Sequence, residues 1–169
     1  MNPAKDNILD WLRDAHAMEQ QAEKMLSTFS ERLEHYPEFK NRIDSHIQVK
    51  KSQQELLKEC IEHCGSSPSV IKDLGAKLLG FSQTASGIFV SDEVVKGAMS
   101  IYVFEQMEIA SYTILGTAAK HIGDARVLAV CEQILPQEIA MAQWLQAYLP
   151  NVTVEFLARS MGAKEAAKR

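Results

Sequence analysis

The chain has 169 residues, of which 46% are apolar and 24% are charged, and its formal net charge is −4. This length and composition predict one soluble domain with a substantial hydrophobic core. The negative charge argues against nucleic acid as a partner, because binding to phosphates requires clustered lysine and arginine side chains. No apolar run approaches the roughly 20 residues that span a membrane, and the N-terminus lacks a signal-peptide pattern, so we expect a cytoplasmic protein without membrane contact.

Four long amphipathic helices are predicted, and no strand-like alternation competes with them. The first spans about residues 3–29, and the second spans about residues 38–63. The apolar stripe of the first helix is interrupted by Glu19 near its middle. His46 flanks the stripe of the second helix and Lys50 interrupts it, so the centre of that helix also has to accommodate polar side chains.

A shorter amphipathic segment at 70–81 and a loop at 82–87 connect the second helix to the third, which begins after Ser91. The fourth helix begins after the capping residue Asp124 and is expected to halt at Pro150. The long connection between the second and third helices contrasts with the short connections elsewhere. This pattern is typical of a bundle with one crossover connection.

We therefore expect an all-α fold, a ferritin-like up-down four-helix bundle with a long crossover and additional short helices. The bundle is assigned to residues 1–150, and residues 151–169 are expected to form a short C-terminal helix and a polar tail. In the fourth helix, helical spacing places Leu128 and Leu135 on the inward face.

Four acids lie on stripes that should face the core. Glu105 and Glu108 occur within the apolar run 101–115 of the third helix, while Glu19 and Glu138 occur singly on the first and fourth helices. Burying an ionised carboxylate costs several kcal/mol unless it is paired, protonated or bound to a metal, and adjacent acids also repel each other. A cation is therefore expected among these four side chains.

One interpretation is a dinuclear iron or manganese site, because these cations prefer oxygen ligands and offset the burial of several acids. Glu105 or Glu108 would bridge the two ions. Glu19 and Glu138 would be terminal ligands, and His46 would be a marginal nitrogen ligand. Such a centre could oxidise Fe(II) or remove peroxide. However, the usual bundle site has two Glu-x-x-His motifs, and this chain has none.

The other interpretation is a metal-free polar core in which Lys50 or Lys51 supplies the positive charge. An ammonium paired with carboxylates could hold the helices together without any cofactor. In this case His46 would hydrogen-bond Glu19 or Tyr112. Both interpretations remain open on the sequence alone.

Three strings resemble the YciE/YciF-type ferritin-like family over roughly residues 5–149: EQMEIASYTIL at 105–115, DAHAMEQQ at 14–21, and His46-Ile47. The resemblance implies a small four-helix core with extra helices, a homodimer and an association with bacterial stress responses, without an established activity. It also implies family acids at Glu19, Glu105, Glu108 and Glu138. Where the family usually has an acid on the second helix, this chain has Val49, followed by Lys50.

The function expected from these observations is that of a non-enzymatic, stress-associated ferritin-like protein with a buried carboxylate cluster, metal-free or weakly metal-binding. The alternative is a dinuclear iron or manganese protein that oxidises Fe(II) or removes peroxide, so whether the chain is an enzyme stays open. A homodimer is expected, with a surface that Trp11, Trp144, Tyr148 and residues 87–90 could supply.

Overall fold

The computed structural model describes residues 3–66 and 94–162 of the chain. Within these ranges the chain forms four long α-helices and no strand, which confirms the all-α prediction. The helices are α1 (Pro3–Ser30), α2 (Pro37–His63), α4 (Val94–Ile122) and α5 (Ala125–Gly162). The predicted segment at 70–81, the loop at 82–87, the start after Ser91 and the apolar residues 87–90 lie outside the described residues.

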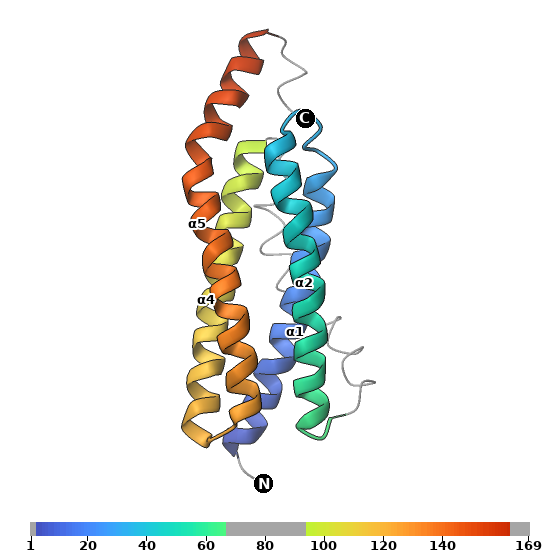
Figure 1. Cartoon of the computed structure of the whole chain (residues 1–169), viewed down its shortest axis with the longest axis vertical. Coiled ribbons are helices and arrows are strands. Elements are labelled where there is room, and N and C mark those ends of the chain that lie inside the picture. The colour runs from blue at the N-terminus through green and yellow to red at the C-terminus, as the bar shows by residue number, and fades with distance from the viewer. Residues whose placement is uncertain (1–2, 67–93, 163–169) are drawn as a thin grey trace.

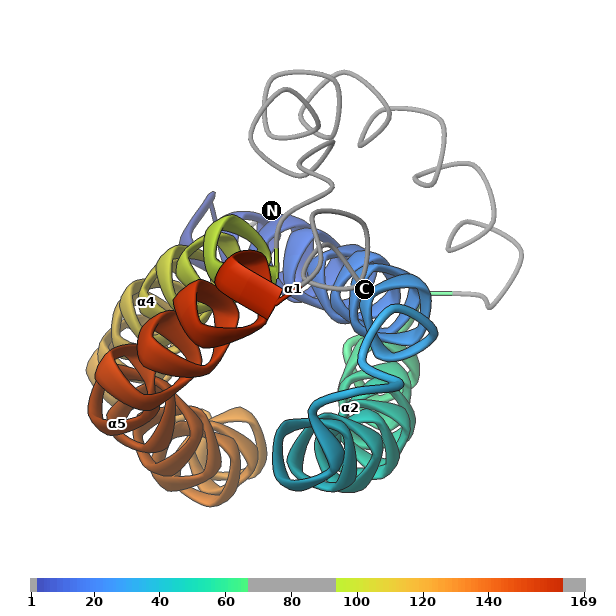
Figure 2. The same cartoon turned by 90° about the horizontal axis from the view of Figure 1, so that it is seen from above.

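The four helices surround one central core (Figures 1 and 2). In Figure 1, α1 and α5 run upward, whereas α2 and α4 run downward. Helix α1 contacts α2 and α4, and α5 contacts the same two helices. Because α2 and α4 run in the same direction, the end of α2 and the start of α4 lie at opposite ends of the bundle. This up-down topology with one long crossover is the ferritin-like arrangement that was predicted.

The ends of three helices follow from local chemistry. Gly65 and Gly123 have φ angles of 82° and 76°, a backbone conformation that glycine adopts without steric cost, and they follow α2 and α4. The Asp124 side chain accepts a hydrogen bond from the Val127 backbone N–H at 3.1 Å, which confirms its predicted role as the cap of α5.

The predicted halt at Pro150 is wrong. Helix α5 continues through Pro136 and Pro150 to Gly162. A proline removes one backbone donor, but the residues on either side of Pro150 compensate by packing, since Tyr148 and Val152 are both buried in the core. Residues 151–162 are thus the continuation of α5 rather than a separate short helix.

The core of the bundle has two apolar clusters. One contains Leu12, Leu57 and Leu115, and the other contains Phe39 and Ile43 from the opposite half of the bundle. The polar side chains described in the next subsection lie where these two clusters meet.

Two sequence predictions about packing need correction. On α5, Val127 and Ile134 are fully buried, while the predicted Leu128 and Leu135 beside them are only partly buried. The second concerns the aromatic residues assigned to a dimer surface. Trp144 stacks on the buried Tyr148 with ring centroids 4.7 Å apart, so Tyr148 belongs to the core and Trp144 is partly buried against it.

Trp11, in contrast, is 40% exposed. None of the helices in the described part of the chain has the length and apolarity needed to cross a bilayer.

Candidate functional site

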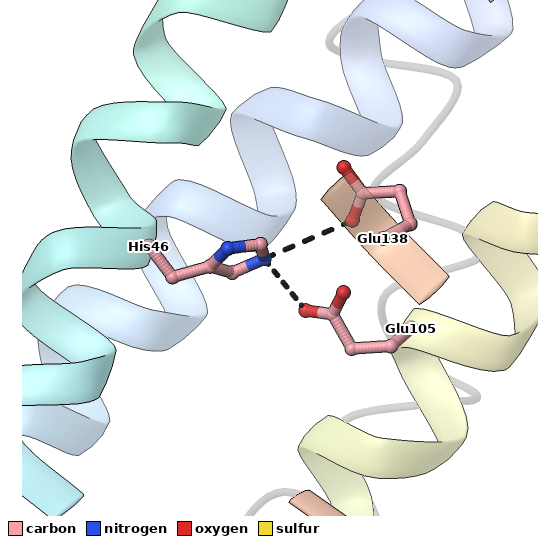
Figure 3. A group of neighbouring side chains, drawn as sticks. All are labelled: His46, Glu105 and Glu138. Carbon is pink, nitrogen blue, oxygen red and sulfur yellow. Dashed lines mark hydrogen bonds and ion pairs between the residues drawn. The ribbon is translucent and has the colours of Figure 1, made fainter. Parts of the chain in front are cut away.

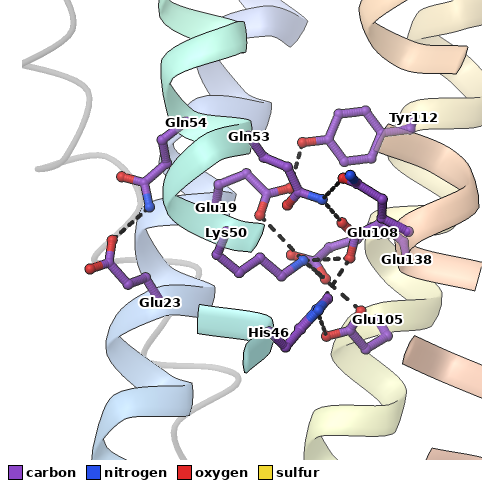
Figure 4. A network of polar contacts seen from close by, with 11 residues as sticks. Glu19, Glu23, His46, Lys50, Gln53, Gln54, Glu105, Glu108, Tyr112 and Glu138 are labelled. Atoms are coloured by element: carbon purple, nitrogen blue, oxygen red, sulfur yellow. Dashed lines mark hydrogen bonds and ion pairs between the residues drawn. The ribbon is translucent and has the colours of Figure 1, made fainter. Parts of the chain in front are cut away.

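A layer of buried polar side chains crosses the middle of the bundle, and all four helices contribute to it (Figure 4). Helical spacing brings them together, because residues three, four or seven positions apart share one face of a helix. The layer consists of Glu19 from α1, His46, Lys50 and Gln53 from α2, Glu105, Glu108 and Tyr112 from α4, and Glu138 from α5.

Lys50 lies at the centre of this layer and is fully buried. Its Nζ atom is 2.5 Å from Glu138 Oε2, 2.8 Å from Glu108 Oε2 and 3.3 Å from Glu19 Oε2. The fourth acid, Glu105, is more distant, with Oε2 at 4.0 Å. An ammonium has three N–H donors, and here three carboxylates from three different helices lie within ion-pair distance of them.

His46 lies beside Lys50 and contacts two of the same acids (Figure 3). Its Nε2 atom is 3.1 Å from Glu105 Oε1, within hydrogen-bond distance, and 3.7 Å from Glu138 Oε2. Burial, together with the nearby Lys50 ammonium, lowers the pKa of His46 to about 3. The imidazole is therefore neutral at physiological pH, so it adds no positive charge to the layer.

The outer contacts of the layer are made by neutral side chains. The hydroxyl of Tyr112 donates a hydrogen bond to Glu19 Oε1 at 2.5 Å. The Gln53 amide donates to Gln137 Oε1 at 2.9 Å and also to Glu138 Oε1. These bonds hold two of the four acids in place on the sides that face away from Lys50.

One ammonium facing four carboxyl groups cannot neutralise them all, and the pKa values reflect this. Burial raises the pKa of Glu19 to about 7 and raises the pKa of both Glu105 and Glu108 well above the ordinary value. Burial would also raise the pKa of Glu138, but the Lys50 ammonium and a hydrogen bond from Glu105 lower it. The four carboxylates hold the pKa of Lys50 above its ordinary value despite burial.

These shifts favour a simple charge distribution. Lys50 and Glu138 form the central ion pair, while the raised pKa values of Glu105 and Glu108 favour their protonated forms. Four oxygen atoms in the layer nevertheless make no hydrogen bond: Glu19 Oε2, Gln53 Oε1, Glu105 Oε2 and Glu108 Oε1. Such unpartnered acceptor atoms are unfavourable when buried, and they are free to interact with a cation.

A dinuclear metal centre of the ferritin-like type does not fit these residues. Two metal ions would each need several ligands and would lie about 3.5–4 Å apart. Lys50 Nζ occupies the space between Glu19, Glu108 and Glu138, at distances of 2.5 to 3.3 Å from their oxygens. One of the two positions is thus filled by an ammonium, and the second helix carries no acid in this layer.

The structure brings together all five predicted site residues: Glu19, His46, Glu105, Glu108 and Glu138. Of the two candidate lysines it selects Lys50, because Lys51 is exposed and faces Glu23 at 3.8 Å. His46 contacts Glu105 rather than Glu19 or Tyr112, contrary to expectation.

Sequence reasoning missed Gln53, which bonds to the acid on α5. Its position could have indicated this role, because Gln53 lies three residues after Lys50 and seven after His46, on the same face of α2.

The topology and the buried carboxyl layer together define a ferritin-like four-helix bundle whose central cation is a lysine. A family model described as "Domain of unknown function (DUF892)" matches residues 3–158. The chain belongs to this family, and the predicted relation to the YciE/YciF-type proteins is confirmed.

Solved structures agree with this assignment. A protein from Xanthomonas campestris pv. campestris is 38% identical, with a TM-score of 0.79 over 95% of this chain and 99% of that one. The Escherichia coli stress protein YciF is 20% identical, with a TM-score of 0.69 over 89% of this chain and 97% of that one. YcfI of Rhodopseudomonas palustris, described as a proposed structural protein, is 22% identical, with a TM-score of 0.67 over 86% and 94%. At these lower identities, the last two show the fold alone.

Proposed function

We propose that this chain is a non-enzymatic ferritin-like protein in which the Lys50 ammonium takes the place of one ion of a catalytic metal pair. The observation that carries the proposal is the position of Lys50 Nζ, within 4.0 Å of carboxylates from all three of the other helices. Its role is structural: it compensates the buried acids and joins the helices.

The dinuclear iron or manganese function is not favoured by this geometry. Oxidation of Fe(II) by oxygen or peroxide needs a redox metal with open coordination positions. The Lys50 ammonium already interacts with carboxylate oxygens that a second metal ion would need as ligands. Its buried positive charge would also repel that ion. A two-metal oxidase would require Lys50 to leave the layer, which would break its contacts with Glu108 and Glu138.

The physiological setting that we propose is a bacterial stress response in the cytoplasm. The support is family membership together with YciF, which is described as a stress protein. A structural role agrees with the description of YcfI as a proposed structural protein.

We further propose that the chain forms a homodimer through the outer face of α4. Four apolar side chains form an exposed stripe there: Met99, Val103, Ala110 and Ile114. They recur at intervals of four, seven and four residues, the spacing of a helix that pairs with another helix. A symmetric dimer buries the same face of both copies.

Light scattering should find a dimer for the wild type and a monomer for Val103→Asp, with Leu157→Asp on α5 as the control.

The proposed lack of oxidase activity is tested by Fe(II) titration under oxygen, using full-length protein purified without chelators. We expect no faster Fe(II) oxidation than in buffer and no absorbing oxidised dinuclear species. Two irons per wild-type chain with rapid oxidation would overturn the proposal. The variant Lys50→Glu, which replaces the ammonium with an acid, should bind more iron, and Lys51→Glu serves as the exposed control.

A further inference from the structure

Ala17 lies on the outer face of α1 and is nevertheless buried. A helix turns by about 100° per residue, so Ala17 lies about 200° from both Ala15 and Glu19, which face the core of the bundle. The exposed fraction of Ala17 is only 6%, although the outer side of a surface helix is normally open to solvent. All residues from Ala15 to Glu19 are buried, so α1 is covered around its whole circumference at this level.

The helices that the structure describes do not account for this cover. Within residues 3–66 and 94–162, α1 packs chiefly against α2 and α4, which flank the inner side of the helix (Figure 2). Glu19 shows this directly, since it contacts Lys50 of α2 and Tyr112 of α4. The outer side of α1 around Ala17 therefore needs another partner.

We infer that the outer face of α1 around Ala17 is the docking surface for the chain's own crossover, residues 67–93. The occupant is a segment of this chain rather than a second molecule, because both neighbours of the segment in the sequence lie beside α1. This docking is independent of the role proposed for Lys50.

The crossover starts and finishes next to α1. Arg13 Nη2 donates a hydrogen bond to Ser66 Oγ at 2.9 Å, so the chain leaves α2 one helical turn from Ala17. At the other end, Gly97 in the first turn of α4 lies directly against the Phe29 ring, near the end of α1. The levels of Arg13 and Phe29 are about 24 Å apart along the helix, which the 27 residues of the crossover can span even in fully helical form.

The composition of the crossover suits this surface. Its part at 70–81 has apolar residues at the spacing of one helical face: Val70, Ile71, Leu74 and Leu78. The small side chain of Ala17 lets such a stripe approach the α1 backbone closely, because the distance between packed helices depends on the side chains at the contact. Docking on α1 also leaves the apolar stripe on the outer face of α4 open for the proposed dimer.

Limited trypsin digestion of the full chain tests the docking, because trypsin cuts after lysine and the crossover contains Lys72 and Lys77. Ala17→Glu places a charged side chain beneath the docked segment and keeps a residue that favours helix. We expect cleavage after Lys72 or Lys77 to be at least about tenfold faster in this variant than in the wild type, because local opening removes protection. The matched control Ala147→Glu makes the same change at an exposed position of α5 and should leave the rate unchanged.

Equal cleavage rates in the wild type and in a folded Ala17→Glu variant would overturn the inference. If Ala17→Glu fails to fold by circular dichroism, carbodiimide cross-linking of the wild type decides instead, since it joins a lysine amine to a carboxylate only when the two are in contact. We expect mass spectrometry to find cross-links from Lys72 or Lys77 to acids of α1. Cross-links from these lysines to other helices alone, or none at all, would also overturn the docking.

Discussion

Lys50 and Lys51 are consecutive residues of α2, yet their side chains occupy opposite environments. Lys50 is fully buried among four carboxyl groups, whereas the side chain of Lys51 is 53% exposed and its Nζ atom lies 3.8 Å from Glu23 Oε1. A helix turns by about 100° per residue, so neighbouring positions can face the core and the solvent. Substituting each of these two lysines in turn therefore tests how much the buried positive charge contributes to stability.

Lys50→Met should destabilise the bundle strongly. Removing one partner of a buried ion pair leaves uncompensated charge, and the free energy of unfolding should fall by about 3 kcal/mol or more. Lys51→Met should change it by less than about 0.5 kcal/mol, because an exposed ion pair contributes little. Urea denaturation followed by circular dichroism measures both variants, and equal effects at the two positions would contradict the assigned role of Lys50.

Tyr112→Phe should lower the free energy of unfolding by about 1–2 kcal/mol. The substitution keeps the ring but removes the hydroxyl that donates to Glu19, leaving a buried carboxyl oxygen without its donor. Tyr102→Phe, on the same helix at a partly buried position, is the control and should change little. An unchanged midpoint for Tyr112→Phe would show that the hydroxyl contributes nothing to stability.

Stability should depend on pH through Glu19. Its pKa is raised to about 7 in the folded chain, so its contribution is fully present below its unfolded value of 4.5 and is lost as the pH rises through about 7. The lowered pKa of His46 acts in the opposite direction below about pH 6.5. The two effects are separated by comparing variants rather than by the wild-type curve alone.

The comparison uses Glu19→Gln, which keeps the shape of the side chain but cannot ionise. Between pH 5 and 8, the wild type should lose stability relative to this variant, and the difference should level off above about pH 8. Urea denaturation at a series of pH values measures it. A difference that is constant with pH would mean that Glu19 ionises normally in the folded protein.

Gly97→Ala should destabilise the contact between α1 and α4. A Cβ atom at Gly97 would overlap the Phe29 ring, which itself packs edge-on against the buried Phe39 with ring centroids 5.3 Å apart. We expect a loss of about 1–3 kcal/mol, reduced by the higher helix propensity of alanine. Gly116→Ala is a milder comparison, since its Cβ would lie 3.2 Å from Cys131 Cβ, and equal stabilities of the two variants would be unexpected.

The helices and the site acids could be predicted from the sequence because both depend on local spacing. Glu19 and Glu138 interrupt regular apolar stripes, and helical periodicity alone places them inward. The choice between Lys50 and Lys51 could not be made in this way. It depends on the rotation of α2 about its axis, which is set by packing against other helices.

The position of the end of α5 was missed for a related reason. A proline lowers local helix stability by about 3 kcal/mol. The sequence reveals this destabilisation, but it does not reveal the packing interactions that offset it. The compensation comes from Tyr148 and Val152, whose burial against α2 and α4 becomes apparent only in the folded bundle. Similarly, the partners of His46 depend on distances between helices that spacing along one helix cannot supply.

The polar layer separates the two apolar clusters of the core, and this arrangement affects how the four helices align along the bundle axis. Contacts between apolar side chains alone tolerate a shift of one helix along another, because one leucine can take the place of the next in the contact. A shift of a single turn in this bundle would carry Lys50 away from its acids and press it against hydrocarbon. The polar layer therefore specifies the register of the four helices along the bundle axis.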